Sequence, residues 1–219
     1  MKRIFLVLAA LIVPLLFAGC SGLGGSIDAS AAVQPGNIVF KDDFSNPKSG
    51  WETWNDPNGS MVAYQNDGLR FFVNEKQFDY WSRPGVRALD VRLEVDVIKL
   101  GGPNDNDFGM ICRYQDRDNF YAFLASSDGY AGILKVQNGS YQILTGPQMK
   151  FSENIRQGEA LNHLRADCNG STLTLQVNGH PFLSAEDADF KAGEIGLLAG
   201  TGEKSGADVF FDNFWAYRP

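Results

Sequence analysis

Two stretches of the chain alternate strictly between apolar and polar residues. Val91, Leu93, Val95 and Val97 are separated by single polar residues, and the segment 171–177 (STLTLQV) alternates in the same way. A period of two places one side of a β-strand in a core and the other side in water. No stretch of a dozen residues keeps a clean period of 3.6, so the pattern predicts antiparallel strands and at most short helical turns.

Asparagine or aspartate followed by glycine marks the boundaries between many of these stretches. Such pairs supply the positive φ angles that two-residue hairpin turns require. They occur at residues 67–68, 128–129, 138–139, 169–170 and 178–179. Together with the alternation, they predict strands near 38–44, 61–65, 69–73, 91–100, 108–115, 120–126, 130–137, 140–144, 161–168, 171–177, 180–184, 194–199 and 207–217.

So many closely spaced strands in one domain predict a two-sheet sandwich or a barrel. In the last strand, Val209 and Phe211 are in phase but Phe214 has the opposite parity. Either both faces of this strand are buried, or a bulge at residues 212–213 turns all three side chains inward. We favour the bulge.

The N-terminal segment has the pattern of a secretory leader. Two cations precede an apolar run from Ile4 to Ala18, which is shorter than the roughly 20 residues that span a bilayer. Residues 17–20 (FAGC) resemble the bacterial lipoprotein signal, although Phe17 departs from its preferred aliphatic residue. This resemblance implies cleavage before Cys20 and a diacylglycerol thioether on its sulfur, with further acylation such as palmitate. Ordinary secretion with an incidental cysteine is the alternative.

These features predict three parts of the chain. Residues 1–19 form the signal peptide, residues 20–36 are the lipidated cysteine with a small, polar tether, and residues 37–219 are the folded domain. A flexible tether of this length places the domain roughly 20 to 25 Å from the lipid headgroups. We expect an extracytoplasmic protein anchored to the cell envelope, on the outer membrane of a diderm or the outer face of a monoderm plasma membrane.

Several segments resemble concanavalin A-like lectin and glucanase domains, a group that includes laminin-G and 3-keto-disaccharide hydrolase-like domains. They are 43–47 (DFSNP) with Gly50 and Trp51, 108–115 (FGMICRYQ), 119–121 (NFY), 173–179 (LTLQVNG), 193–197 (GEIGL) and 209–214 (VFFDNF). The resemblance covers residues 38–218 and implies an all-β jelly roll of two curved antiparallel sheets. Any ligand would then lie on the concave face or on the rim loops.

Glycosidases of this group that resemble laminarinases carry Glu-x-Asp-x-x-Glu on one strand. Here Glu94 and Asp96 begin that pattern, but Lys99 ends it. An ammonium group with a pKa of about 10 is a poor proton donor to a leaving oxygen near neutral pH. We therefore predict no catalytic residue on this strand. The two histidines, His163 and His180, have no nucleophile beside them in the sequence, so a Ser-His-Asp triad is not expected.

The segment 104–107 (NDND) concentrates oxygen ligands, which calcium prefers. A structural Ca²⁺ held by Asp105 and Asp107 is one interpretation, and laminin-G-like domains often carry such an ion at the rim. The alternative is local hydrogen bonding in a turn, which Asn and Asp also favour. No other cofactor is expected.

Cys112 and Cys168 share the parity of core residues, so both are expected in the interior. A disulfide requires Cα atoms within about 7 Å, whereas facing sheets lie about 10 Å apart. We expect free buried thiols, with a disulfide as the alternative for an exported protein.

Aromatic side chains outside the alternating strands are candidates for stacking on sugar rings. Trp51 belongs to the family pattern and is expected to anchor the chain, which leaves other aromatics as ligand contacts. Hydrogen-bonding groups on neighbouring strands would orient the same ligand. The candidate ligand residues are Trp54, Tyr80, Trp81, Glu94, Asp96 and Arg113, the last three with Arg92 and Gln115 on the expected solvent side of their strands.

The formal net charge of −7 becomes −9 when Lys2 and Arg3 are removed with the leader, which disfavours a nucleic-acid partner. We expect a lipid-anchored, non-catalytic surface protein whose domain binds a polysaccharide or a surface protein. The first alternative is a carbohydrate-active enzyme, either a glycoside hydrolase or a lyase or hydrolase acting on keto-sugars. The second is a structural envelope lipoprotein without a small ligand.

Overall fold

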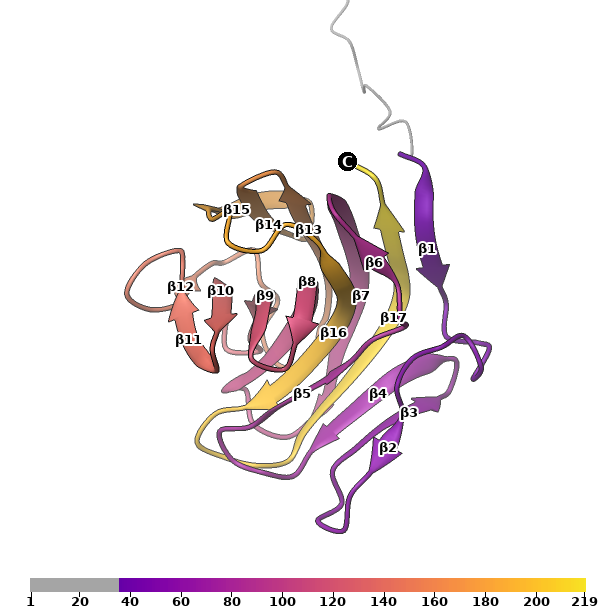
Figure 1. Cartoon of the computed structure of the whole chain (residues 1–219). Coiled ribbons are helices and arrows are strands. Elements are labelled where there is room, and N and C mark those ends of the chain that lie inside the picture. The colour runs from indigo at the N-terminus through magenta and orange to yellow at the C-terminus, as the bar shows by residue number, and fades with distance from the viewer. Residues whose placement is uncertain (1–35) are drawn as a thin grey trace, which may run out of the picture. The chain divides into compact units, whose positions relative to one another are not determined.

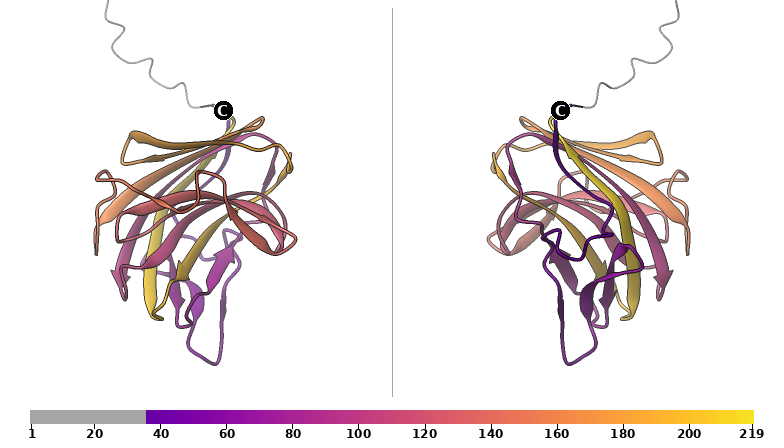
Figure 2. Two further views of the ribbon diagram at one scale, coloured as in Figure 1. Left: turned by 90° about the vertical axis from the view of Figure 1, so that its left-hand side faces the viewer. Right: turned by 90° about the vertical axis from the view of Figure 1, so that its right-hand side faces the viewer.

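The computed structural model describes residues 36–219, which form two antiparallel sheets packed face to face (Figures 1 and 2). The predicted leader and Cys20 lie outside these residues. Within them, the start and the end of the domain are adjacent, because the Arg218 amide donates to the Asn37 carbonyl at 3.1 Å. The described residues contain no helix long and apolar enough to cross a membrane.

The first sheet has nine strands and contains most of the N-terminal and C-terminal segments. In spatial order its strands are β15 (His180–Glu186), β14 (Thr172–Val177), β13 (Leu161–Asn169), β7 (Val91–Gly101), β17 (Ala207–Tyr217), β4 (Gly68–Val73), β3 (Met61–Gln65) and β2 (Trp54–Asn55), with β1 (Ile38–Asp42) also paired to β17. We call it sheet A.

The second sheet, sheet B, has eight strands. In spatial order they are β11 (Ser140–Ile143), β10 (Tyr130–Gln137), β9 (Asn119–Ala125), β8 (Asn106–Asp116), β16 (Gly193–Thr201) and β5 (Asp79–Ser82), with β12 (Lys150–Phe151) beside β10 and β6 (Arg87–Ala88) beside β16.

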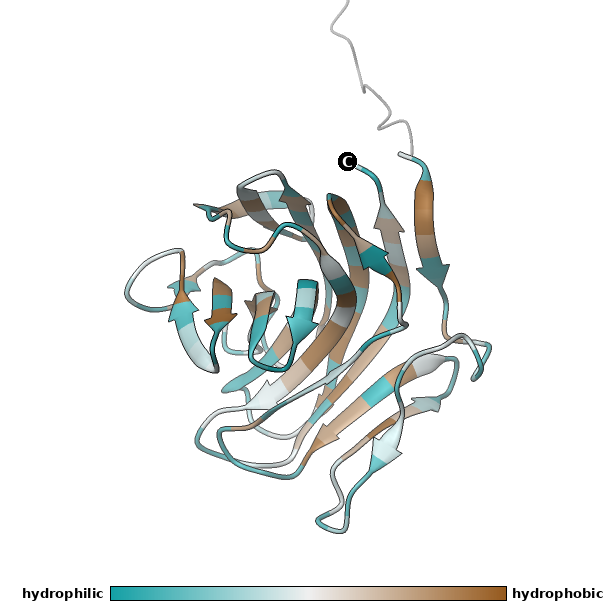
Figure 3. Cartoon of the chain, in the orientation of Figure 1, coloured by the Kyte–Doolittle hydropathy of each residue, from teal (hydrophilic) through white to brown (hydrophobic). Residues whose placement is uncertain are grey.

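Sheet A follows the predicted alternation. In β7, the four side chains Val91, Leu93, Val95 and Val97 are at most 1% exposed, and the residues between them are half-buried. Hydrophobic colours run along the strands in Figure 3, whereas the hairpin turns are mostly hydrophilic. Asn138 and Asn178 adopt φ angles of +52°, as expected for the Asn-Gly hairpin turns.

The bulge predicted in the last strand is confirmed. The register of β17 on β7 shifts between Asp212 and Trp215, and Asn213 has a φ angle of +52°. Phe214 is fully buried as a result and packs edge-on against Trp51, with ring centroids 5.0 Å apart. The Trp51 indole also donates to Asp42 at 2.9 Å, which fixes the entry of the chain as expected from the family pattern.

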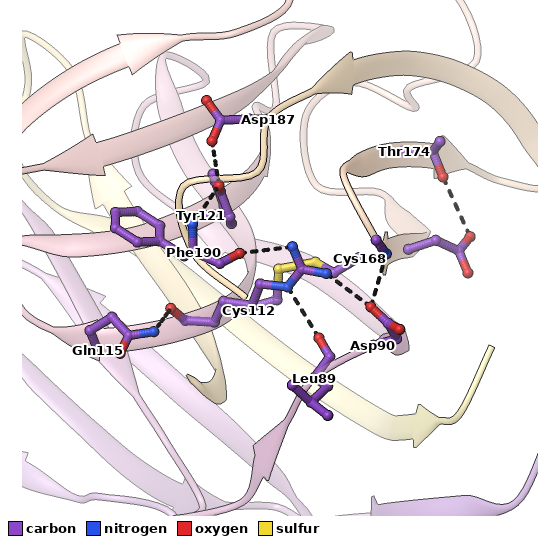
Figure 4. Close-up of a disulfide and its surroundings, with 12 residues drawn as sticks. Leu89, Asp90, Cys112, Gln115, Tyr121, Cys168, Thr174, Asp187 and Phe190 are labelled. Atoms are coloured by element: carbon purple, nitrogen blue, oxygen red, sulfur yellow. Dashed lines mark hydrogen bonds and ion pairs between the residues drawn. A yellow bond between two sulfur atoms is a disulfide. The ribbon is translucent and has the colours of Figure 1, made fainter. Parts of the chain in front are cut away.

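The expectation of free thiols is wrong. Cys112 of β8 and Cys168 of β13 form a disulfide between the two sheets, with Cα atoms 6.9 Å apart (Figure 4). The uniform sheet spacing of about 10 Å that argued against this bond does not hold here. The register of β8 on β9 shifts after Cys112, so the strand departs from a regular sheet where it reaches β13.

The same irregularity overturns the prediction that Arg113 faces solvent. Arg113 has a φ angle of +53° and is 2% exposed. Its guanidinium donates to the carbonyls of Leu89 and Phe190, at 3.1 and 2.9 Å, and to the Asp90 carboxylate at 3.0 Å. Parity along a strand fails at a bulge, and here it turns a charged side chain into a structural contact.

Candidate functional site

Sheet B is buried on both of its faces. Beyond the core shared with sheet A, a second apolar cluster covers its opposite face and contains Ile111, Tyr114, Phe120, Ala122, Leu124, Leu134, Val136 and Leu198. Trp81, Ile143 and Met149 pack against this cluster. Since an ordinary antiparallel sheet leaves this face to water, its burial indicates that the sheet curls over it.

A cavity of about 570 Å³ opens on this concave face, and we call it the hollow. Residues from both edge strands, β5 and β11, line it, which is consistent with the curl of the sheet. The size lies within the range of small-molecule sites, about 300 to 1,000 Å³. The lining residues are Gln77, Phe78, Asp79, Trp81, Asp107, Arg117, Asp118, Val136, Gly139, Tyr141 and Thr201.

One row of the sheet brings two aspartates together across a glycine. Asp79 of β5 pairs with Gly200 of β16, and Gly200 pairs with Asp107 of β8 on its other side. A Cβ atom on Gly200 would lie 1.8 Å from Oδ1 of Asp79. The Asp79 carboxylate therefore lies over the glycine, in the direction of Asp107.

Both aspartates have pKa values well above the usual range. Burial raises the pKa of Asp79 to about 6. Burial also raises the pKa of Asp107 to about 7, with smaller contributions from the negative charges of Asp79, Asp105 and Asp128. Both carboxyl groups line the hollow, so a ligand there would meet groups that titrate near neutral pH.

Aromatic rings stand beside this acidic pair. Trp81 is two residues from Asp79 on the same strand and packs on Phe120 and Tyr114, with ring centroids 5.6 and 6.2 Å away. Tyr141, on the opposite edge, is 55% exposed. Burial raises the Tyr141 pKa to about 12, and the negative charges of Asp79, Asp107 and Asp118 add to the shift.

The six predicted ligand residues do not form one site. Trp81 alone lines the hollow. Trp54 and Tyr80 contact each other at a tilted angle of 51°, with ring centroids 4.2 Å apart, and pack against the core between the sheets. The Tyr80 hydroxyl donates to Glu75 and Asp56. Burial raises the pKa of Tyr80, and the two carboxylates raise it further.

Glu94 and Asp96 lie on the outward face of sheet A, which is the face away from the core. His163 Nδ1 is 2.8 Å from Asp96 Oδ1, and the Asn213 amide donates to Asp96 at 3.0 Å. Glu94 is 3.8 Å from His163 Nε2. These polar groups bind one another on the solvated face of the strand.

The predicted calcium ligands Asp105 and Asp107 border one pocket, together with Asp128. Asp105 also accepts a hydrogen bond from the Glu203 amide at 3.3 Å, and Asp107 opens onto the hollow as well. Within residues 36–219, no three acidic, histidine or cysteine side chains converge closely enough to hold a metal ion. The acidic side chains alone therefore do not provide the roughly six to eight oxygens that calcium takes.

Sequence reasoning missed Asp79, Tyr141 and the role of Gly200. Segment 78–82 (FDYWS) does alternate, since Asp79 and Trp81 face the hollow while Tyr80 packs toward the core. It is only four residues long as a strand, β5, which is too short for the alternation to stand out. Asp107 was identified as an acidic candidate, but as a metal ligand.

No protein-family model matches the chain, and no curated protein matches it in sequence. Solved structures do resemble it. The carbohydrate binding module CBM66 from Bacillus subtilis has a TM-score of 0.61 and 17% identity, covering 77% of this chain and 95% of that one. The chain has a jelly-roll fold.

Two further jelly-roll neighbours are enzymes by their names. A GH43 protein from Bacillus licheniformis has a TM-score of 0.60 and 15% identity over 82% of this chain, but the match spans 39% of that protein. A β-1,3-glucanase from Mycobacterium marinum has a TM-score of 0.56 and 13% identity, covering 84% of this chain and all of that one, 100%. At these identities the likeness establishes the architecture and leaves the activity to the site.

Proposed function

We propose that this domain binds a glycan in the hollow of sheet B. The observation that carries the proposal is that two aromatic rings, the half-buried Trp81 and the exposed Tyr141, line the hollow beside Asp79 and Asp107, whose carboxyl groups have no partner among residues 36–219. Rings stack on the CH-rich faces of sugars, and the carboxyls accept hydrogen bonds from hydroxyl groups. The name of the first neighbour, a carbohydrate binding module, supports the same class of ligand.

The proposal includes binding without turnover. The strand that begins the laminarinase-like pattern belongs to sheet A, and its Glu94 and Asp96 point away from the core and bind His163 and Asn213. Lys99, at the position of the second glutamate, is 5% exposed and donates to the Gly102 carbonyl at 3.0 Å. This pattern therefore supplies no catalytic carboxylate to the hollow.

A glycoside hydrolase is the second candidate function, and the Asp79–Asp107 pair favours it. Hydrolysis needs one protonated and one ionised carboxyl group on either side of a glycosidic bond. Two strand spacings put the Cα atoms of the pair about 9.5 Å apart, and the Asp79 carboxylate leans over Gly200 toward Asp107. Release of reducing ends from a bound polysaccharide, lost in Asp107→Asn, would establish this activity in place of binding alone.

We also propose that Cys20 carries a lipid and holds the domain at the outer side of a membrane. The support is the sequence of the leader, in which two cations and an apolar run precede Cys20. A surface glycan is then within reach of the anchored domain.

The test of the binding function is a glycan array probed with the Cys20→Ser chain, which keeps the protein soluble. We expect a defined set of oligosaccharides to bind, and Trp81→Ala to lose them. An array without any bound glycan, on a protein with a normal melting transition, contradicts the proposal and favours a protein ligand or a structural envelope role.

A further inference from the structure

Asp79 and Asp107 have no ion-pair partner among the described residues. Burial alone accounts for the raised pKa of Asp79, and burial with three other aspartates accounts for that of Asp107, without a hydrogen bond from any described residue. Asp187, by contrast, accepts from Lys135 at 2.6 Å and from Tyr121. The pair therefore has no donor and no positive charge supplied by residues 36–219, and its carboxyl groups open onto the hollow, where a ligand can supply both.

Nearby acidic residues make the electrostatic potential around the pair more negative. Asp105 and Asp128 are close enough to act on Asp107, and one oxygen of Asp128 is itself buried without a hydrogen-bond partner. Among the residues lining the hollow, the single cation is Arg117, which is mostly exposed and lies 3.5 Å from Asp118. The electrostatic potential at the pair is therefore negative, and it disfavours an acidic sugar.

The architecture holds the two carboxyl groups in place. Both residues are within paired strands, and the absence of a side chain on Gly200 leaves the space into which Asp79 leans. Trp81 lies two residues after Asp79 on the same strand and on the same face. A sugar ring stacked on Trp81 would therefore present its substituents to the two carboxylates. Such a fixed acceptor pair beside a stacking surface is suited to one ligand group on a sugar ring.

We infer that the hollow selects a sugar carrying a protonated amine, with the ammonium seated between Asp79 and Asp107. This inference rests on the proposed glycan-binding function and names the class of its ligand. An ammonium group has three donors and a full positive charge, so it satisfies both carboxylates at once, and charge-assisted hydrogen bonds are about twice as strong as neutral ones. A hydroxyl group in the same place donates one hydrogen bond and brings no charge.

Other cations fit the hollow less well. A metal ion needs more ligands than this pair provides, and the described residues contain no group of three that could hold one. A lysine side chain from a protein could reach the carboxylates, but its narrow stem would leave Trp81 and Tyr141 uncovered. A sugar ring fills the space beside both aromatic side chains and carries the charge to the same place.

The experiment compares three hexasaccharides with one backbone geometry, at pH 6.5, where a large share of glucosamine amines is protonated, by isothermal titration calorimetry on the Cys20→Ser chain. They are a β-1,4-linked glucosamine hexamer, its N-acetylated counterpart and cellohexaose, which has hydroxyl groups in place of the amines. We expect the glucosamine hexamer to bind about tenfold or more tightly than either neutral hexamer. In the Asp79→Asn, Asp107→Asn double variant we expect the preference for the glucosamine hexamer over the neutral hexamers to fall to within about twofold.

Asp105→Asn is the matched control, because it removes a nearby negative charge that does not line the hollow. We expect Asp105→Asn to keep most of the affinity preference for the glucosamine hexamer. If Asp105→Asn loses that preference as fully as the double variant, the effect comes from the general negative potential, and the proposed position of the ammonium between Asp79 and Asp107 is wrong. Equal affinity for the amine and neutral hexamers, or no binding of the amine hexamer, overturns the inference while the array result still decides glycan binding. Polylysine that competes as well as the glucosamine hexamer would assign the site to a protein partner and overturn it too.

Discussion

The carboxylate of Asp79 occupies the space that a side chain on Gly200 would need, since a Cβ atom there would lie 1.8 Å from its Oδ1. The Phe78 carbonyl oxygen is also 3.0 Å from that position, so the backbone of the edge strand closes the other side. This contact links the packing of β16 to the geometry of the acidic pair. The placement of Asp79 therefore depends on the absence of a side chain one strand away.

Gly200→Ala should displace Asp79 and reduce stability. Overpacking of a filled site costs about 1 to 3 kcal/mol, and the displaced carboxylate would no longer face Asp107. Chemical denaturation measures the first effect and glycan affinity the second. Gly101→Ala is the matched control, because a Cβ atom at Gly101 meets no atom within 4 Å and its stability should change by less than about 0.5 kcal/mol. Equal stability of the two variants would contradict the contact.

Asp107→Asn should make the domain more stable at neutral pH. The pKa of Asp107 is raised from 3.8 to about 7, so the folded state holds a proton that the unfolded state has lost. Wild-type stability should therefore decrease as the pH rises from about 4 to about 7. The asparagine does not titrate, so its advantage should grow over that window to on the order of 1 to 3 kcal/mol, allowing for access of water through the hollow.

Urea denaturation of both proteins at pH 4, 6 and 8 measures this difference. If the two proteins differ in the free energy of unfolding by the same amount at all three pH values, the pKa of the Asp107 carboxyl is not raised. A gain in stability on loss of a functional group is expected where a site holds unpaired charge for a ligand.

Reduction of the disulfide should destabilise the domain strongly. Cys112 and Cys168 are 56 residues apart, and closing a loop of that length removes chain entropy worth about 4 kcal/mol from the unfolded state. The Cys112→Ala, Cys168→Ala variant should melt roughly 8 to 16 °C below the oxidised protein, since 1 kcal/mol corresponds to about 2 to 4 °C in a domain of this size. The oxidised protein measured with and without reductant provides the control, and unchanged melting would show that the thiols are free.

The sequence predicted most of the fold because its strands are long and alternate on one face. The alternation from Val91 to Val97 correctly predicted which side of β7 faces the core. The change of parity before Phe214 was enough to locate the bulge that the structure has at Asn213. The turns at Asn138 and Asn178 followed from the φ angles that their glycine neighbours permit. Each of these signals is local, so no knowledge of the other sheet was needed.

The candidate site depends on relationships that alternation does not express. Sheet B is buried on both faces, so its strands β8, β9 and β10 read as continuous apolar runs and say nothing of which face is concave. Arg113 was misplaced because a bulge follows Cys112, and the disulfide was rejected because sheet spacing was taken as uniform. Asp79 and Asp107 are 28 residues apart in the chain. They come together because Gly200 of β16 pairs with Asp79 on one side and with Asp107 on the other.

Cys20→Ser should release the protein from membranes. A diacylglyceryl cysteine buries two acyl chains, and each buried CH₂ contributes about 0.8 kcal/mol, so the wild-type protein should stay in the membrane fraction while the variant becomes soluble. Cell fractionation and the intact mass of the purified protein measure the two parts of this prediction. Membrane retention of the serine variant, with no mass difference between the two proteins, would contradict lipidation at this residue.

Trp81→Ala should weaken glycan binding by about 1 to 3 kcal/mol, the range for loss of a central aromatic anchor. The ring packs on Phe120 at 5.6 Å and still borders the hollow, so its loss removes stacking area from the ligand and some packing from the floor. Trp215→Ala is the matched control, because Trp215 stacks on Tyr217 at 5.8 Å on the strand that bears the outward face of sheet A. We expect Trp215→Ala to leave affinity unchanged. If Trp81→Ala lowers the melting temperature but not the affinity, Trp81 is part of the core alone and the ligand must bind at another part of the rim.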